Sequence, residues 1–214
     1  MNAQTRREIR SGLVALAVSG LFFTLGILLR GAVELADPAS FIRAAASPYY
    51  IPGWALILVG FVLQLYGSFG LYRYLTYQAE SLIALLAFLV RIVGLALSLP
   101  LFTFLTIHVP VIATLYQQGN QEVLTVLEAN FTGTGLALLG IGAMADLIGF
   151  ILFAIAMWHD GRLPKWTVIL FVLSLPLLAA PVTFLTELLG AVLLLISTAT
   201  IAWKGWQESE ARTG

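Results

Sequence analysis

The sequence predicts an all-α protein, a helical bundle that crosses a lipid bilayer six times. Of its 214 residues, 60% are hydrophobic and only 10% are charged, whereas a soluble domain carries about 25% charged residues. A chain this apolar has too little polar surface to cover a globule in water, and a bilayer is the solvent that fits it. No charged or Ser/Pro-rich linker divides the chain, so we expect a single transmembrane domain over residues 1–214.

Six apolar segments give the order of the expected spans. Crossing the hydrocarbon region takes about 20 helical residues. The segments, in chain order, are residues 11–29, 51–72, 81–116, 132–157, 165–180 and 182–203. The first follows three arginines, as a signal peptide would, but it exceeds the usual apolar core of about 7–15 residues. We therefore expect it to remain as the first span.

The third segment is too long for one upright span. It stays apolar for 36 residues and contains Pro100 and Pro110. Proline lacks a backbone donor and kinks a helix, so residues 101–116 either continue the span, lean, project or re-enter the bilayer. A seven-span alternative divides this segment at Pro100, but it leaves almost no loop there.

The basic residues predict that both termini are cytoplasmic, because lysine and arginine collect on that side of a membrane protein. With six spans, one side holds eight basic residues and the other holds two. The eight are Arg6, Arg7, Arg10, Arg73, Arg162, Lys165, Lys204 and Arg212, and the two are Arg30 and Arg43. The seven-span alternative would place Arg162 and Lys165 outside.

Three connections have their own patterns. Asp37-Pro38 is typical of a helix start and predicts a short helix through Phe41 and Ile42. In residues 121–129, apolar side chains stand between polar ones, as in a helix that lies in the membrane surface. Each of these two stretches is alternatively an ordinary loop. The short segment 165–180, which contains Pro176, should form a tight helical hairpin with the last span through Ala179-Ala180-Pro181.

Small residues recur on one face of most spans, which predicts close helix packing there. These faces carry Gly12, Ser19 and Gly26; Gly60, Gln64 and Gly67; Ala84, Ala87, Arg91, Gly94 and Ser98; Gly135, Gly142, Asp146 and Gly149; and Thr183, Glu187, Gly190 and Ser197. Every strongly polar group within the spans except His108 therefore lies on a small-residue face.

Arg91 and Asp146 should meet inside the membrane. Each lies ten or eleven residues from the inner end of its span, a depth of about 15–17 Å. An unpaired charge at that depth costs at least about 2.5–3.5 kcal/mol, so we expect an ion pair that Gln64 joins. Such a pair either fixes helix register or forms a polar site for a solute, ion or proton.

Two further ionisable groups are weaker candidates for a site. Glu187 lies one turn into the last span, where the helix N-terminus stabilises a carboxylate without any site; a site role is the alternative. His108 is either a hydrogen-bonded histidine near the outer interface or the ligand of a haem or pigment. His159, the second histidine, belongs to the opposite side.

Several classes of site and partner lack their residues. The chain has no cysteine, which excludes disulfides, thiolate metal sites and cysteine nucleophiles. It has no phosphate-binding glycine-rich loop and no histidine placed for a hydrolytic triad. Eleven basic residues balance eleven acidic ones, so charge predicts no nucleic-acid partner. We expect no metal and no cofactor, and the sequence favours a role without catalysis.

The junction between the fourth and fifth spans reads Trp158-His-Asp-Gly-Arg-Leu-Pro-Lys-Trp166. This W-x-x-G-x-L-P-x-W pattern resembles that of uncharacterised six-helix bacterial integral membrane proteins, a domain-of-unknown-function family. The arginine in the third span and the glycine-rich fourth span are similar, so the resemblance covers the C-terminal two-thirds. It implies a bacterial inner (cytoplasmic) membrane and no particular activity.

Three functions follow in order of expectation. The first is a structural or accessory membrane component that packs with itself, as a homo-oligomer, or with a larger membrane complex, because little of the chain lies outside the spans. The second is a small-solute or ion transporter that uses Arg91, Asp146, Gln64 and Glu187 at a midplane site, although no inverted repeat is evident. The third is a haem- or pigment-binding protein or a membrane-embedded enzyme.

Overall fold

The computed structural model is helical throughout the residues that it describes, which are 3–34, 37–179 and 183–211. These residues form eight helices and no β-strand. The helices are α1 (Ala3–Arg30), α2 (Pro38–Ala45), α3 (Tyr50–Thr76), α4 (Leu82–Gln117), α5 (Val123–Phe131), α6 (Gly133–Asp160), α7 (Lys165–Ala179) and α8 (Phe184–Ala211). Five of them, α1, α3, α4, α6 and α8, are long and apolar enough to cross a bilayer. The predicted helical membrane bundle is confirmed to that extent.

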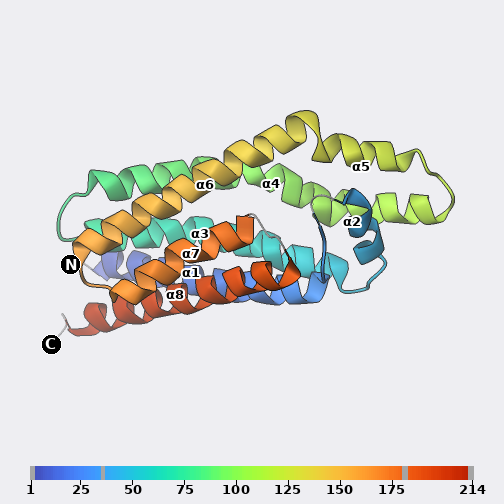
Figure 1. The fold of residues 1–214 in the computed structure, drawn as a ribbon. Coiled ribbons are helices and arrows are strands. Elements are labelled where there is room, and N and C mark those ends of the chain that lie inside the picture. The colour runs from blue at the N-terminus through green and yellow to red at the C-terminus, as the bar shows by residue number, and fades with distance from the viewer. Residues whose placement is uncertain (1–2, 35–36, 180–182, 212–214) are drawn as a thin grey trace.

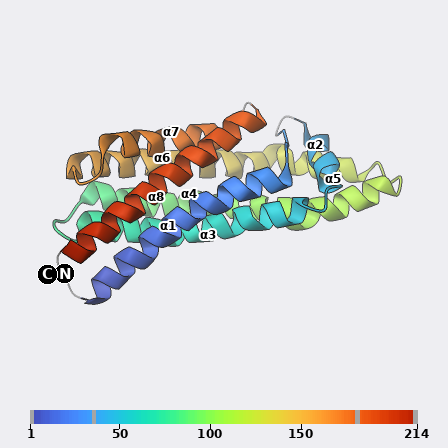
Figure 2. The same cartoon turned by 90° about the horizontal axis from the view of Figure 1, so that it is seen from below.

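The long helices lie side by side, and the start of α1 and the end of α8 lie at the same end of the bundle (Figure 1). We call this the terminal end. Helices α2 and α5 and the last turns of α4 lie at the other end, which we call the distal end (Figures 1 and 2). Helix α1 packs mainly between α3 and α8, and α4 packs mainly on α6.

Helix α4 is one continuous helix of 36 residues that runs through Pro100 and Pro110. It is not divided at Pro100, so it gives no support to the seven-span alternative. At 1.5 Å per residue it is about 54 Å long, and its C-terminal part projects beyond the ends of α1 and α8 (Figure 1). Helices α2 and α5 both contact it there. Residues 101–116 therefore continue the helix, and only its last turns project (Figure 1).

Both short distal helices form where the sequence predicts them. The Asp37 carboxylate accepts a hydrogen bond from the backbone N–H of Ala39 at 3.1 Å, and Pro38 occupies the first turn of α2. A side-chain oxygen and a first-turn proline suit the donor groups that a helix start leaves unpaired. Helix α5 covers most of the predicted stretch 121–129. That it lies in a membrane surface stays a prediction.

Helix α7 is short. Its 15 residues span about 22 Å, less than the bilayer core, so a sixth crossing stays a prediction. It packs along α8, and Gly190 of α8 approaches α7 so closely that an added Cβ would lie 2.9 Å from the carbonyl oxygen of Ser174. The predicted turn between the two helices includes Ala180 and Pro181, which lie outside the described residues.

The small-residue faces are packing surfaces, as predicted. A Cβ added at Gly12 would lie 2.5 Å from the Cα atom of Gly70, which shows that the α1 and α3 backbones touch. One added at Gly94 of α4 would lie 2.5 Å from the backbone nitrogen of Asp146 in α6. Gly135, the first glycine predicted on the α6 face, lies outside the part of the chain whose packing is described.

Candidate functional site

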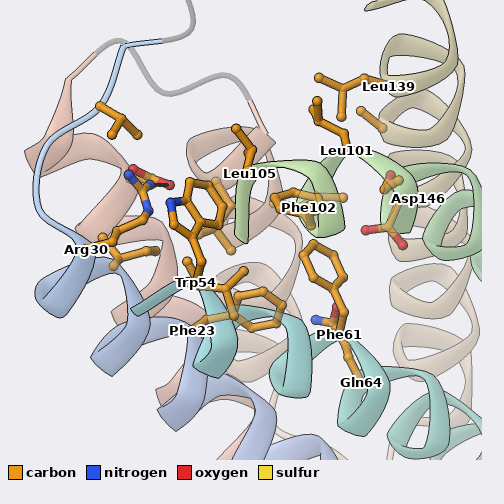
Figure 3. Close-up of a pocket in the computed structure, with 18 of the residues that line it drawn as sticks. Phe23, Arg30, Trp54, Phe61, Gln64, Leu101, Phe102, Leu105, Leu139 and Asp146 are labelled. Carbon is orange, nitrogen blue, oxygen red and sulfur yellow. Dashed lines mark hydrogen bonds and ion pairs between the residues drawn. The ribbon is translucent and has the colours of Figure 1, made fainter. Parts of the chain in front are cut away.

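A cavity of about 150 Å³ lies between the helices. Residues of α1, α3, α4, α6, α7 and α8 line it, and Phe41 of α2 lines its distal part. Most of the lining is apolar, and the polar lining residues are Arg30, Gln64, Ser98, Asp146 and Glu187. In the close-up, Arg30 and Asp146 lie on opposite sides of the space, with aromatic rings between them (Figure 3). We call this space the central cavity.

Aromatic side chains from three helices form one wall of the central cavity. Phe61 of α3 lies edge-on to Phe23 of α1, with ring centroids 4.9 Å apart, and lies 4.4 Å from Phe102 of α4. The Trp54 ring lies 5.9 Å from Phe102. Such contacts fix the rings in place beyond their burial alone. The wall is therefore a preformed apolar surface (Figure 3).

The distal side of the cavity carries the ion pair between Arg30 and Glu187, which joins the end of α1 to the start of α8. Arg30 is only 3% exposed. Its guanidinium also donates to the carbonyl oxygen of Gly31 at 3.1 Å and lies 4.7 Å from the Trp54 ring centroid. Glu187 is thus a partner of a buried arginine.

Arg30 was not predicted as a site residue and was counted only among the basic residues of the outer side. Arg30 closes the first apolar span, and Glu187 stands one turn into the last. The two residues have opposite charges and both lie within about one helical turn of the outer ends of their spans, a pattern similar to the one that predicted the Arg91–Asp146 pair. The aromatic wall had no such pattern, because phenylalanines are frequent in every span.

Arg91 of α4 and Asp146 of α6 form the predicted ion pair. The Nε atom of Arg91 lies 3.4 Å from Oδ1 of Asp146, and the guanidinium carbon lies 3.8 Å from the Phe150 ring centroid. Arg91 is 0% exposed. Its aliphatic stem packs on Gly149, where any side chain would collide with it.

The pair leaves several polar atoms without partners. Among the described residues, no nitrogen of the Arg91 guanidinium has a hydrogen-bond partner, and neither does Oδ1 of Asp146. A buried charge without hydrogen bonds is costly, so these groups depend strongly on each other. Arg91 does not line the central cavity, whereas Asp146 does and is 7% exposed. Arg91 therefore stands behind Asp146 as its counter-ion.

Gln64 and Ser98 complete the polar side of the cavity next to Asp146. The Ser98 hydroxyl donates to the carbonyl oxygen of Gly94 at 3.0 Å, and its oxygen keeps a free lone pair. Gln64 is buried and lines the same cavity as Asp146, and its amide forms no hydrogen bond with any described residue, so its part in the ion pair stays a prediction. The amide offers a donor and an acceptor beside the cavity.

His108 lies apart from the central cavity. It is exposed on the projecting part of α4, and its ring centroid lies 5.5 Å from that of Phe104. Within residues 3–34, 37–179 and 183–211, no group of three or more metal-binding side chains is close enough together to hold a metal ion. The structure therefore brings together Asp146, Gln64 and Glu187 around one cavity, with Arg91 behind Asp146 and His108 elsewhere.

The Trp158–Trp166 junction is a tight turn at the terminal end. Gly161 has φ of 71°, a left-handed conformation that ends α6 without the strain a side chain would add. Arg162 donates to the carboxylate of Asp160 and to the carbonyl oxygen of Tyr74 at 2.8 Å. Although burial opposes its charge, the hydrogen bond that Arg162 donates to the Asp160 carboxylate keeps the pKa of Arg162 above its ordinary value. The glycine and the arginine of this junction are thus explained by the local structure of the turn.

Comparison of the chain with protein-family models, with curated proteins and with solved structures finds no match to any of them. The resemblance of the junction to the bacterial six-helix family therefore stays a prediction.

Proposed function

We propose that this membrane protein is a transporter of a small, largely apolar solute that it binds in the central cavity. The cavity itself is the observation that carries the proposal. Protein interiors are close-packed, and an empty space costs stability because its lining loses contacts. A space of about 150 Å³ with hydrogen-bonding groups on two sides is larger than the voids that close packing usually leaves between helices. It has the form of a small-molecule site, apolar with a few polar groups.

The charges around the cavity favour a solute without net charge. Two cations, Arg30 and Arg91, balance two anions, Glu187 and Asp146, in ion pairs. A charged solute would enter without a counter-ion, which is costly away from water. The Gln64 amide and the Ser98 hydroxyl supply neutral hydrogen bonds. An uncharged molecule with one polar group fits these partners and the aromatic wall.

The helices that contain proline favour movement around the cavity. Pro100 lies inside α4 and Pro176 lies inside α7. The neighbouring residues Leu101 and Leu175 both line the cavity. A proline removes one backbone hydrogen bond and allows a continuous helix to bend at that point. These positions are suitable hinges for opening the cavity to one side and then to the other.

The six-span topology belongs to the same proposal. The shared terminal end of α1 and α8 (Figure 1) fits an even number of crossings, with α7 as the sixth. The excess of basic residues at that end favours a cytoplasmic location for it. The cavity side with Arg30 and Glu187 then faces outward. In a bacterium the protein would lie in the inner membrane.

A structural or accessory role is the second candidate, and one observation favours it. Arg91 is fully buried against Phe150 and does not line the cavity. The Arg91–Asp146 pair is therefore sufficient to fix the register of α4 on α6 without any solute. A haem or pigment role has less support, because His108 lies outside the cavity.

Cysteine labelling tests whether the cavity is a water-filled path. The chain has no cysteine, so a single-cysteine variant carries one thiol. Ser98→Cys places that thiol at the cavity, and Ser197→Cys is the matched control. Ser197 is also buried and also donates to its own helix, but it does not line the cavity. Only the Ser98→Cys variant should react with a charged, membrane-impermeant methanethiosulfonate.

The side from which the reagent acts separates the candidates. In a transporter, the thiol of Ser98→Cys should react with reagent added outside intact cells. It should also react with reagent added to the cytoplasmic side in inverted vesicles, because the cavity opens alternately to the two sides. If the thiol reacts no faster than that of Ser197→Cys from either side, the cavity is closed and the result favours the structural role. Reaction from one side alone would contradict transport.

A further inference from the structure

A groove at the terminal end is separate from the central cavity. It lies between the first turns of α1 and the last turns of α8 and has a volume of about 400 Å³. Its lining combines three arginines with apolar and aromatic side chains. The lining residues are Ala3, Arg6, Arg7, Arg10, Ser11, Val14 and Trp206. We call this the arginine groove.

Arg10 is held in place on one side of the groove. Its guanidinium carbon lies 4.5 Å from the centroid of the Trp206 ring, and its Nη2 atom lies 3.8 Å from Oε1 of Glu210. The Trp206 indole N–H also donates to Glu210 at 2.7 Å. This cluster joins α8 to the start of α1 and orients one cation toward the groove.

Arg6 and Arg7 lack such partners. Neither forms an ion pair or a side-chain hydrogen bond with any residue in the described part of the chain, and Nε of Arg6 is buried without an acceptor. The nearby acids are already engaged, since Glu8 pairs with Arg73 at 3.2 Å and Glu210 pairs with Arg10. The groove therefore has an excess of two positive charges and of N–H donors. An anion with several oxygens would satisfy both.

The lining of the arginine groove changes from basic to apolar along α1. Beyond the arginines it continues past Ser11 to Val14, which is 43% exposed. Trp206, which forms the opposite wall, is also exposed and is the type of residue that lies at the boundary between head groups and acyl chains. A ligand that follows this lining has an anionic end and an apolar end. A soluble phosphate compound would use only the first.

We propose that the arginine groove binds an anionic phospholipid of the adjacent leaflet, with the phosphate against Arg6 and Arg7 and an acyl chain along Val14. Arginine forks bind phosphate oxygens through paired hydrogen bonds. Basic clefts between membrane helices are suitable sites for such head groups. The lipid would join α1 to α8 at the terminal end. This inference does not depend on the proposed transport.

Native mass spectrometry of the full-length protein tests the site. The protein in mild detergent is titrated with phosphatidylglycerol or phosphatidylcholine of the same acyl chains, and the bound lipids are counted. The wild type should retain phosphatidylglycerol more strongly than phosphatidylcholine. Arg6→Gln and Arg7→Gln should each weaken phosphatidylglycerol binding about fivefold, as expected for one basic residue near an anionic lipid. Binding of phosphatidylcholine should not change.

Lys204→Gln is the matched control, because it removes one positive charge from α8 near the same end without changing the groove lining. It should leave phosphatidylglycerol binding within about twofold of the wild type. An equal loss in all three variants would show surface attraction without a site and would overturn the proposal. No preference for phosphatidylglycerol in the wild type would do the same. Displacement of the lipid by millimolar glycerol 3-phosphate would reassign the groove to a soluble phosphate compound.

Discussion

Arg91→Met is expected to lower the free energy of unfolding by about 3–5 kcal/mol, because it leaves Asp146 as a buried charge without a counter-ion. Methionine keeps most of the aliphatic stem that packs on Gly149, so the loss would report the charge more than the volume. Asp146→Leu should destabilise the protein to a similar extent by leaving Arg91 unpaired. Thermal or denaturant-induced unfolding of the purified variants in detergent measures both effects.

The double variant Arg91→Met/Asp146→Leu should recover much of that stability. Replacing both charges removes the cost of burying them together with their attraction, and the result is often neutral or stabilising. Arg43→Met is the control, because the Arg43–Asp37 pair is exposed and its loss should matter little. A double variant as unstable as the sum of the two single variants would contradict the pairing.

The double variant also separates the two functional candidates. If the pair only fixes helix register, the recovered double variant should keep its biological role. If Asp146 belongs to a solute site, stability should return while the role stays lost.

Gly12→Ala is expected to destabilise the protein by about 1–3 kcal/mol, the usual cost of overpacking a close contact. The added Cβ would lie 2.5 Å from the Cα atom of Gly70. That atom belongs to the α3 backbone and cannot rotate away, so α1 and α3 must separate. The melting temperature of the purified variant in detergent measures the effect.

Gly140→Ala is the matched control for this substitution. Gly140 lies within α6, and a Cβ added there meets no atom within 4 Å. The alanine should therefore leave stability unchanged or raise it by about 0.5–1 kcal/mol through helix propensity. A Gly12→Ala variant as stable as the Gly140→Ala variant would show that α1 and α3 do not pack through their glycines.

The elements that the sequence predicted well are those fixed by local or periodic patterns. Span lengths follow from apolar runs, and the start of α2 follows from Asp37-Pro38. The contact between Arg91 and Asp146 followed from two further constraints, matched depth and a small-residue face on each helix. Burying either charge alone is so costly that few other arrangements of α4 and α6 satisfy both constraints.

The central cavity could not be predicted in the same way. Its volume depends on side chains of seven helices and on the rotamers of Trp54, Phe61 and Phe102, none of which is set by its neighbours in sequence. Gln64 lies on the expected face of α3, but whether its amide reaches the ion pair or the cavity depends on helix rotation of a few degrees. The path of residues 101–116 was also open, because Pro100 permits both a break and a continuous helix.

A density map of the protein purified gently in native lipid tests the proposed transport site most directly. The transport hypothesis predicts density for a compact small molecule in the central cavity, beside the aromatic wall and within hydrogen-bond distance of Gln64 or Asp146. Purification in the presence of excess lipid should not displace it. A cavity that has closed around Phe61 and Phe102, or one filled by an acyl chain continuous with the surrounding bilayer, would contradict a solute site.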